Sequence, residues 1–365
     1  MQPPMQIAIN ISALPFQAEP AFRSFLQSLF QLWAVKMSGH QYLFIGTEEE
    51  KNFLNKESKN SSWLEAPLPG KKIANQFWQR VRLPALLKKN KTEILISTGG
   101  LNIIPSQIPV VLLVYGNDLH RGKDKGFAKT LHQAARIIVF ADKDTGQLSG
   151  EYNLPQEKIV VLKAAPAFPS PPLSFEEKAH LKNRYTGGKE FFMYSGIIGG
   201  HQNLTNLLKA FSVFKKRQGT GTRLLLEGPV QKRDKTFTDS LSHYKYRDEL
   251  VLTGELPPAE RASLIAAAYA LVDPALRPHA GIPMLEAAAA GVPSIAVNGH
   301  PVLKEAAYLT ADMNDYVDLA AGLMQLYKDE GLRNQLIQLI TAHSPLYTVS
   351  ESVDCFDKIM QPLLR

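Results

Sequence analysis

The sequence predicts an α/β protein made of two Rossmann-like, doubly wound domains that face one another across a cleft. Short apolar runs of strand length alternate with longer stretches of helical periodicity, which is typical of parallel sheets covered by helices on both faces. The chain has 365 residues, which is enough for two domains that each bury a core. A proline-rich segment at 165–172 separates two such series of strands and helices.

In the first series, helical periodicity is clearest over residues 21–36, where Phe22, Phe25, Leu26 and Leu29 share one face. Helical stretches of this kind lie between several of the apolar runs. The predicted strands are 6–11, 41–45, 93–97, 109–115, 136–141 and 158–162.

The second series begins after Pro166, Pro169, Pro171 and Pro172, which can continue neither a helix nor a central strand. We therefore predict an N-terminal domain over residues 1–165, a C-terminal domain over 166–346 and a last helix within 347–365. The predicted strands of the second series are 191–195, 223–226, 250–253, 270–273 and 294–297. The predicted helices are 204–216, 258–268, 284–290, 316–327, 331–342 and 350–364.

Composition and charge narrow the class of partners. The net charge of +7 favours anionic partners. No nucleic-acid-binding motif is present, so we expect phosphate-bearing small molecules or anionic lipid rather than nucleic acid. The single cysteine, Cys355, excludes an internal disulfide framework and fits a reducing compartment. The first residues lack the pattern of a signal peptide, and runs such as 108–115 are too short for a membrane span, so we expect a cytoplasmic protein.

A glycine-rich loop joins the predicted strand 191–195 to the predicted helix 204–216. Glycines let the backbone approach a phosphate, and the helix start offers N–H groups and the positive end of its dipole. Such loops are also ordinary turns in domains of this class, so the loop alone favours a structural role. The candidate ligand-binding residues here are Gly199, Gly200, His201, Gln202 and Asn203.

A second candidate is a short alanine-rich helix that starts near Pro283 and ends before Pro293. Its first N–H groups can hold a diphosphate. Glu286 lies about one turn into this helix, where its carboxylate could accept hydrogen bonds from ribose hydroxyls; the alternative is that it only complements the helix dipole. The candidate residues are Gly281, Ile282, Pro283, Met284 and Glu286.

Together these segments resemble the donor-binding domain of the family-4 retaining glycosyltransferases, which have the GT-B fold. The resemblance runs through most of the second half and is weaker in the first. The final stretch resembles the helix that in this family crosses back to the first domain. The segments that carry the resemblance are 191–211, 252–256, 259–269, 271–296 and 347–364, with 78–84 and 108–119 in the first half.

The resemblance implies an enzyme that moves a sugar from a nucleotide sugar to an acceptor, with retention at the anomeric carbon. The acceptor would be a glycan or a lipid-linked sugar of polysaccharide or glycoconjugate biosynthesis. Glu286 would bind the ribose, Leu256 would border the base, and Asn117 and Asp118 would face the cleft on the acceptor side. The resemblance supplies no catalytic base and implies neither a metal nor another cofactor.

Several positions depart from the family pattern. Pro278 stands where the family has the first of two glutamates separated by seven residues, and Gln202 stands at a lysine. The leaving diphosphate needs cations or N–H donors, so Arg277, His279 and His201, which flank these positions, are candidates to supply charge. These departures also favour an alternative function, a catalytically inactive relative that binds a sugar, a nucleotide or a partner enzyme.

Basic and apolar residues are interleaved over 71–91, which contains no acidic residue. Such a segment can contact an anionic membrane, where each basic residue adds up to about 1 kcal/mol. The alternative is a surface helix whose apolar face lies in the core. We therefore include peripheral contact with the inner face of the membrane among the predictions.

Overall fold

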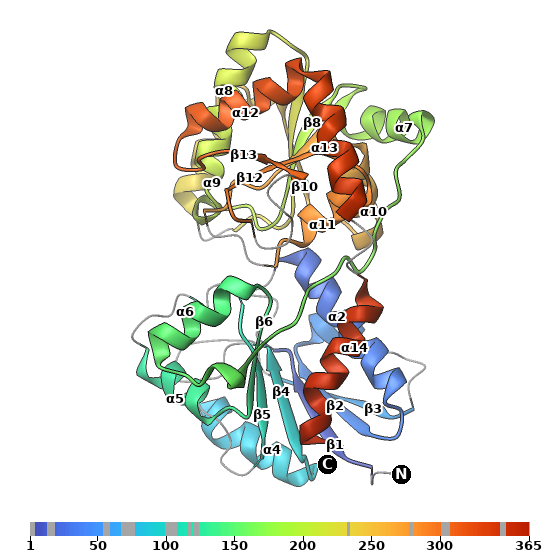
Figure 1. Ribbon diagram of the computed structural model, residues 1–365, viewed down its shortest axis with the longest axis vertical. Helices are drawn as coiled ribbons and strands as arrows, with labels where there is room; N and C mark the ends of the chain where they lie inside the picture. Colours follow the sequence, from blue (N-terminus) through green and yellow to red (C-terminus); the bar gives the residue numbers. More distant parts are fainter. Residues whose placement is uncertain are drawn as a thin grey trace. The chain divides into compact units, whose positions relative to one another are not determined.

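The computed structural model groups the chain into two compact units, which are described separately (Figure 1). The first unit contains residues 1–18, 25–164 and 349–365, and the second contains 19–24 and 165–348. The residues that the structure describes are 4–12, 19–53, 59–66, 77–98, 108–115, 119, 124–231, 234–276, 280–300, 307–343 and 348–364.

The first unit is built on a parallel sheet in the order β3-β2-β1-β4-β5-β6-β7. Successive residues such as Ile7, Ala8 and Ile9 are all buried, because helices cover both faces of the sheet. The strands are β1 (Gln6–Asn10), β2 (Gln41–Gly46), β3 (Ser61–Glu65), β4 (Ile94–Thr98), β5 (Val110–Leu113), β6 (Arg136–Val139) and β7 (Ile159–Val161).

Helices α4, α5 and α6 share one apolar core with this sheet, whereas α14 packs on α2. The ring of Phe356 from α14 lies 5.0 Å from that of Trp33 on α2, and Asp357 accepts a hydrogen bond from the Trp33 indole N–H. The described helices are α2 (Pro20–Lys36), η1 (Glu48–Phe53), η2 (Trp78–Arg82), α4 (Leu83–Lys89), α5 (Lys125–Gln133), α6 (Asp142–Tyr152), η4 (Gln156–Lys158), α14 (Val349–Met360) and η9 (Gln361–Leu363).

The second unit also has a parallel sheet, in the order β10-β9-β8-β11-β12-β13. Its strands are β8 (Phe191–Ser195), β9 (Arg223–Glu227), β10 (Leu250–Gly254), β11 (Ala270–Val272), β12 (Ser294–Ala296) and β13 (Leu309–Thr310). Its described helices are α7 (Phe175–Thr186), η5 (Gly200–Gln202), α8 (Leu204–Gln218), α9 (Lys235–Ser242), η6 (Arg247–Glu249), α10 (Pro258–Ala267), α11 (Ile282–Ala289), α12 (Tyr316–Lys328) and α13 (Glu330–His343).

The two faces of this second sheet are covered by different helices (Figure 1). Helices α8, α9 and α12 contribute to one apolar cluster and α10 and α11 to the other, while α13 contributes side chains to both. Since β8, β9 and β10 progress in one direction along the sheet and β11, β12 and β13 in the other, the strand order reverses between β8 and β11. In sheets of this kind, ligands bind outside the carboxyl ends of the strands at such a reversal.

The predicted fold class of two Rossmann-like parallel sheets is confirmed. Among the residues that the structure describes, no helix is both long enough and apolar enough to cross a membrane.

Candidate functional site

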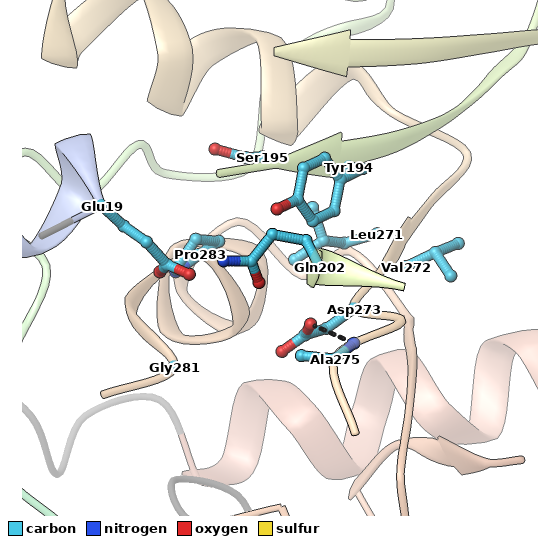
Figure 2. Close-up of a pocket in the computed structure, with 10 residues that line it drawn as sticks. All are labelled: Glu19, Tyr194, Ser195, Gln202, Leu271, Val272, Asp273, Ala275, Gly281 and Pro283. Atoms are coloured by element: carbon cyan, nitrogen blue, oxygen red, sulfur yellow. Dashed lines mark hydrogen bonds between the residues drawn. The ribbon is translucent and has the colours of Figure 1, made fainter. Parts of the chain in front are cut away.

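A pocket lies where the strand order of the second unit reverses (Figure 2). Ser195 ends β8, and Asp273 directly follows β11, so each of the two strands at the reversal contributes a polar side chain. The side-chain ends of Glu19, Gln202 and Asp273 converge in this space (Figure 2). The lining residues are Glu19, Tyr194, Ser195, Gln202, Leu271, Val272, Asp273, Ala275, Gly281 and Pro283.

A buried carboxylate joins two loops at the edge of this pocket. Glu227, at the end of β9, is fully buried; it accepts a hydrogen bond from the Ser195 hydroxyl at 2.6 Å and one from the Leu256 N–H at 3.2 Å. Burial raises the pKa of Glu227 above its usual range, although these hydrogen bonds oppose the shift. Leu256, which was predicted to border a nucleobase, is therefore held through its backbone by Glu227.

The backbones directly after β8 and β9 approach each other closely. Gly228 has a φ of 126°, and a β-carbon at this position would overlap the carbonyl group of Gly196. The Gly196 N–H also donates to the carbonyl of Glu227 at 3.0 Å. Glycine at 228 therefore lets the two strand ends approach each other, which sets the spacing of Ser195 and Glu227.

Glu286 forms a buried ion pair with Arg261. Two guanidinium nitrogens donate to its carboxylate, Nη2 to Oε1 at 2.8 Å and Nε to Oε2 at 3.2 Å, and the two side chains are 1% and 0% exposed. Burial raises the pKa of Glu286, and the adjacent guanidinium opposes the shift. Each carboxylate oxygen accepts one of these bonds and keeps a further lone pair, so the predicted bond to ribose hydroxyls stays a prediction.

Asp273 is held from two sides. Its Oδ1 accepts a hydrogen bond from the Ala275 N–H at 3.0 Å, and its Oδ2 lies 3.2 Å from Nε2 of His300. The His300 side chain is fully buried, whereas that of Asp273 is 21% exposed. Asp273 was not predicted as a site residue, although it is the last residue of the predicted strand 270–273, at the end where ligands bind.

The glycine-rich loop uses several of its N–H groups within the protein. The Gly200 N–H donates to Asp234 at 2.7 Å, and the N–H groups of Gln202 and Asn203 donate to Gly199 and Gly200. The Asn203 side chain donates to the carbonyls of Pro274 and Met313, which ties this loop to its neighbours. A diphosphate at this loop would therefore depend on side chains such as Gln202, which lines the pocket.

The start of α11 is the second predicted binding element. Gly281 adopts the left-handed conformation with φ 59° and lines the pocket together with Pro283. Among the residues that the structure describes, none accepts a hydrogen bond from the N–H of Gly281 or Ile282. The Met284 side chain is buried in the apolar cluster under α11, so its contribution to a ligand is limited to the backbone.

The described part of the pocket is lined by acidic rather than basic side chains. Burial and the charges of Asp273 and Glu227 raise the pKa of Glu19 to about 8, so its carboxyl is largely protonated at neutral pH. No lysine or arginine is among the lining residues that the structure describes. Among all the residues that the structure describes, there is no group of three or more His, Cys, Asp or Glu side chains that could hold a metal ion.

Other predicted site residues lie outside the residues that the structure describes. These are Asn117 and Asp118 on the acceptor side, and Arg277 and His279 before α11; Pro278, the departure from the family pattern, also lies outside them.

Sequence reasoning missed Arg261, Glu227 and Asp273. Glu227 and Asp273 have one available signal, since each is a carboxylate at the end of an apolar strand. Arg261 has none, because its partner is distant in the sequence.

Comparison with known proteins matches part of the chain to one protein family. Residues 175–341 match the family of glycosyl transferases group 1. The chain is 25% identical over 219 residues to the O-antigen chain mannosyltransferase B of Escherichia coli, a match that covers 59% of this chain and only 58% of that protein.

Solved structures agree on the fold. Anabaena Alr3699/HepE in complex with UDP and glucose superposes with a TM-score of 0.78 at 11% identity, over 98% of this chain and all of that one. WaaG, a glycosyltransferase involved in lipopolysaccharide biosynthesis, superposes with a TM-score of 0.72 at 14% identity, over 97% of this chain and 99% of that one. The two sheets thus define a GT-B fold. The match to the group 1 glycosyl transferases covers residues 175–341, which lie in the second unit.

Proposed function

We propose that this protein transfers a hexosyl group from a nucleotide sugar to a hydroxyl of a glycan or lipid-linked acceptor, with retention of the anomeric configuration. The bond between the anomeric carbon and the diphosphate oxygen breaks, and the acceptor oxygen bonds to the same face of that carbon. A nucleoside diphosphate and a proton are released. The observation that carries the proposal is the pocket at the strand-order reversal of the matched domain, bordered by Gln202 and the start of α11.

The roles of the residues follow from their chemistry. The N–H groups at the start of α11 would hold the diphosphate, since a helix start carries about half a positive charge. Glu286 would accept hydrogen bonds from the ribose, and the turn at Leu256 would border the base. The relatives support a hexose and a nucleotide sugar: one is a mannosyltransferase, and another was solved with UDP-glucose.

The second candidate is a protein that binds a nucleotide or a sugar without turning it over. It is favoured by the neutral Gln202 and by the carboxyl groups in a pocket whose described lining contains no lysine or arginine. Without a full cation, the charge that develops on a leaving diphosphate is stabilised less, and removal of one such contact typically costs a few kcal/mol.

A panel of UDP, GDP, ADP and their sugars tests both candidates. A ligand that binds only the folded state raises the melting temperature, so a thermal-shift screen identifies the nucleotide. Release of nucleoside diphosphate from the best nucleotide sugar, measured with and without a glycan acceptor, then reports turnover. Binding with turnover supports the transferase, binding without turnover supports the second candidate, and no shift with any nucleotide contradicts both.

A further inference from the structure

We propose that Asp273 is the carboxylate that binds hydroxyl groups of the donor sugar, and that the buried His300 holds it in place. This inference rests on the proposed function, because it assigns a residue to the sugar part of the same pocket. Asp273 lies at the end of β11 and lines the pocket together with Gln202, Gly281 and Pro283 (Figure 2).

The position of Asp273 is fixed by both chain and side chain. Its N–H donates to the carbonyl of Ile295 at 2.9 Å, which continues the pairing of β11 with β12. One carboxylate oxygen accepts from Ala275 and the other faces His300, so both oxygens are anchored in one orientation. Each oxygen keeps one lone pair that can accept a hydrogen bond from a hydroxyl group.

Among the residues that the structure describes, the His300 ring has no hydrogen-bond partner other than Asp273. Its Nδ1 is buried and has no hydrogen-bond partner there, and Nε2 contacts only Asp273. Its backbone N–H donates to the Tyr308 hydroxyl at 2.8 Å, which fixes the start of the side chain. Asp273 is thus the hydrogen-bonding partner of this buried ring among the described residues, and a buried polar group is stabilised by such a contact.

The chemistry of the pocket selects hydroxyl groups rather than phosphates for this contact. Asp273 lies near enough to Glu19 for its negative charge to raise the pKa of that carboxyl, and the same charge on Asp273 repels an anion. A sugar hydroxyl is a neutral donor, and a carboxylate is a strong acceptor for it. The diphosphate is therefore expected nearer to the N–H groups of α11, with the sugar on the side of Asp273.

The test compares each nucleotide sugar with its own nucleoside diphosphate. Asp273→Asn keeps the shape and can still accept from Ala275, but it replaces a charged acceptor by a neutral amide. We expect calorimetry to give about a tenfold loss of affinity for UDP-glucose or GDP-mannose, whichever the parent binds, and unchanged affinity for UDP or GDP. Deoxy analogues of the bound sugar refine the result: removal of the hydroxyl that Asp273 holds should weaken the parent but not Asp273→Asn.

His300 is tested as a positioning residue. His300→Gln can still place an N–H near Asp273, whereas His300→Leu cannot. We expect His300→Leu to lose part of the sugar-dependent affinity and His300→Gln to retain it, with both variants binding the nucleoside diphosphate as the parent does.

Two different results would overturn the inference, and they can be distinguished from each other. If Asp273→Asn weakens the nucleoside diphosphate and the nucleotide sugar equally, or weakens neither, Asp273 does not bind the sugar and the proposed function stands. If the parent binds no nucleotide at all, the proposed function fails and this inference fails with it.

Discussion

Arg261 and Glu286 form a two-pronged ion pair that is almost completely shielded from solvent. Glu286 is the residue that the family resemblance predicts to bind the ribose of a nucleotide. In the structure both of its oxygens already accept a bond from α10, which joins the start of α11 to its neighbouring helix. The third guanidinium nitrogen, Nη1, is buried and has no partner among the residues that the structure describes.

The first prediction concerns the contribution of this pair to stability. Arg261→Met leaves the Glu286 carboxylate buried and unpaired, which should lower the free energy of unfolding by about 3–5 kcal/mol. The double variant Arg261→Met with Glu286→Met should recover most of this loss, because neither member of the pair is then left buried without its partner. Denaturant unfolding of the parent, the two single variants and the double variant measures the coupling.

The matched control for this cycle is Lys51→Met, which removes an exposed pair with Glu48 and should change stability little. A double variant that is as unstable as the sum of the two single variants would contradict the prediction.

The second prediction concerns nucleotide affinity. Glu286→Gln keeps an acceptor for Arg261 but removes the charge that strengthens bonds to ribose hydroxyls. It should weaken binding of the best nucleotide by about 1–3 kcal/mol in calorimetry. Glu176→Gln, an exposed substitution on α7, is the control. Unchanged affinity in folded Glu286→Gln would restrict Glu286 to its partnership with Arg261.

The third prediction restores the family's side chains in the donor site. Gln202 lines the pocket, and Pro278 lies outside the residues that the structure describes. Gln202→Lys together with Pro278→Glu should raise the affinity for a nucleotide sugar or its rate of hydrolysis, because a full cation then faces the diphosphate. Measurement is by calorimetry and by release of nucleoside diphosphate. A double variant that behaves as the parent does in both assays would favour the binding protein over the transferase.

The fourth prediction concerns anionic membranes. Phe77 and Val81 are 54% and 51% exposed, and Arg80 and Arg82 beside them are exposed as well, while Trp78 is buried in the core. Weak, salt-sensitive binding to vesicles that contain an anionic lipid is therefore expected. Arg80→Glu with Arg82→Glu should abolish sedimentation with such vesicles.

The control for the vesicle assay reverses the same number of charges elsewhere in the first unit. Lys125 and Lys129 are exposed on α5, and Lys125→Glu with Lys129→Glu should leave sedimentation nearly unchanged. Equal sedimentation of the Arg80/Arg82 variant and the parent would exclude this surface as the site of contact.

The fifth prediction is a pH dependence in the first unit. Burial raises the pKa of Asp144 from 3.8 to about 6, so the folded state holds its proton more tightly than the unfolded state does. The free energy of unfolding should therefore fall as the pH rises from about 4 to about 6, by up to about 3 kcal/mol, and stay level above. Asp144→Asn should remove this part of the slope, whereas Asp142→Asn, an exposed change on the same helix, should keep it. Identical slopes in denaturant unfolding of Asp144→Asn and the parent would refute the assignment.

The apolar strands were the most predictable part of the fold. A strand buried on both faces is a continuous apolar run, so β8 was predicted with its observed bounds and β9, β10, β11 and β12 within one residue at either end. Two strands were missed: β3, whose residues are only partly buried or exposed, and β13, which is two residues long. Neither has the apolar run on which the prediction depends.

The candidate site was less predictable because its partners are distant in the sequence. The glycine loop and the start of α11 have local signatures, and Gln202, Gly281 and Pro283 do line the pocket. Nothing local indicates that Arg261 pairs with Glu286, that Asp234 takes the Gly200 N–H, or that His300 contacts Asp273. These contacts depend on how strands and helices are ordered in the sheet, and the sequence pattern does not specify that order.

The close approach of the backbone at Gly196 and Gly228 has a consequence for how this site can diversify. At that point backbone meets backbone, so no side chain can be exchanged to widen or narrow the gap. The Ser195 hydroxyl and the Glu227 carboxylate, which are 2.6 Å apart, lie next to this backbone contact. If the pocket binds a nucleotide sugar as proposed, substitutions at side chains that line it, such as Gln202 and Asp273, are the expected way to change its preference.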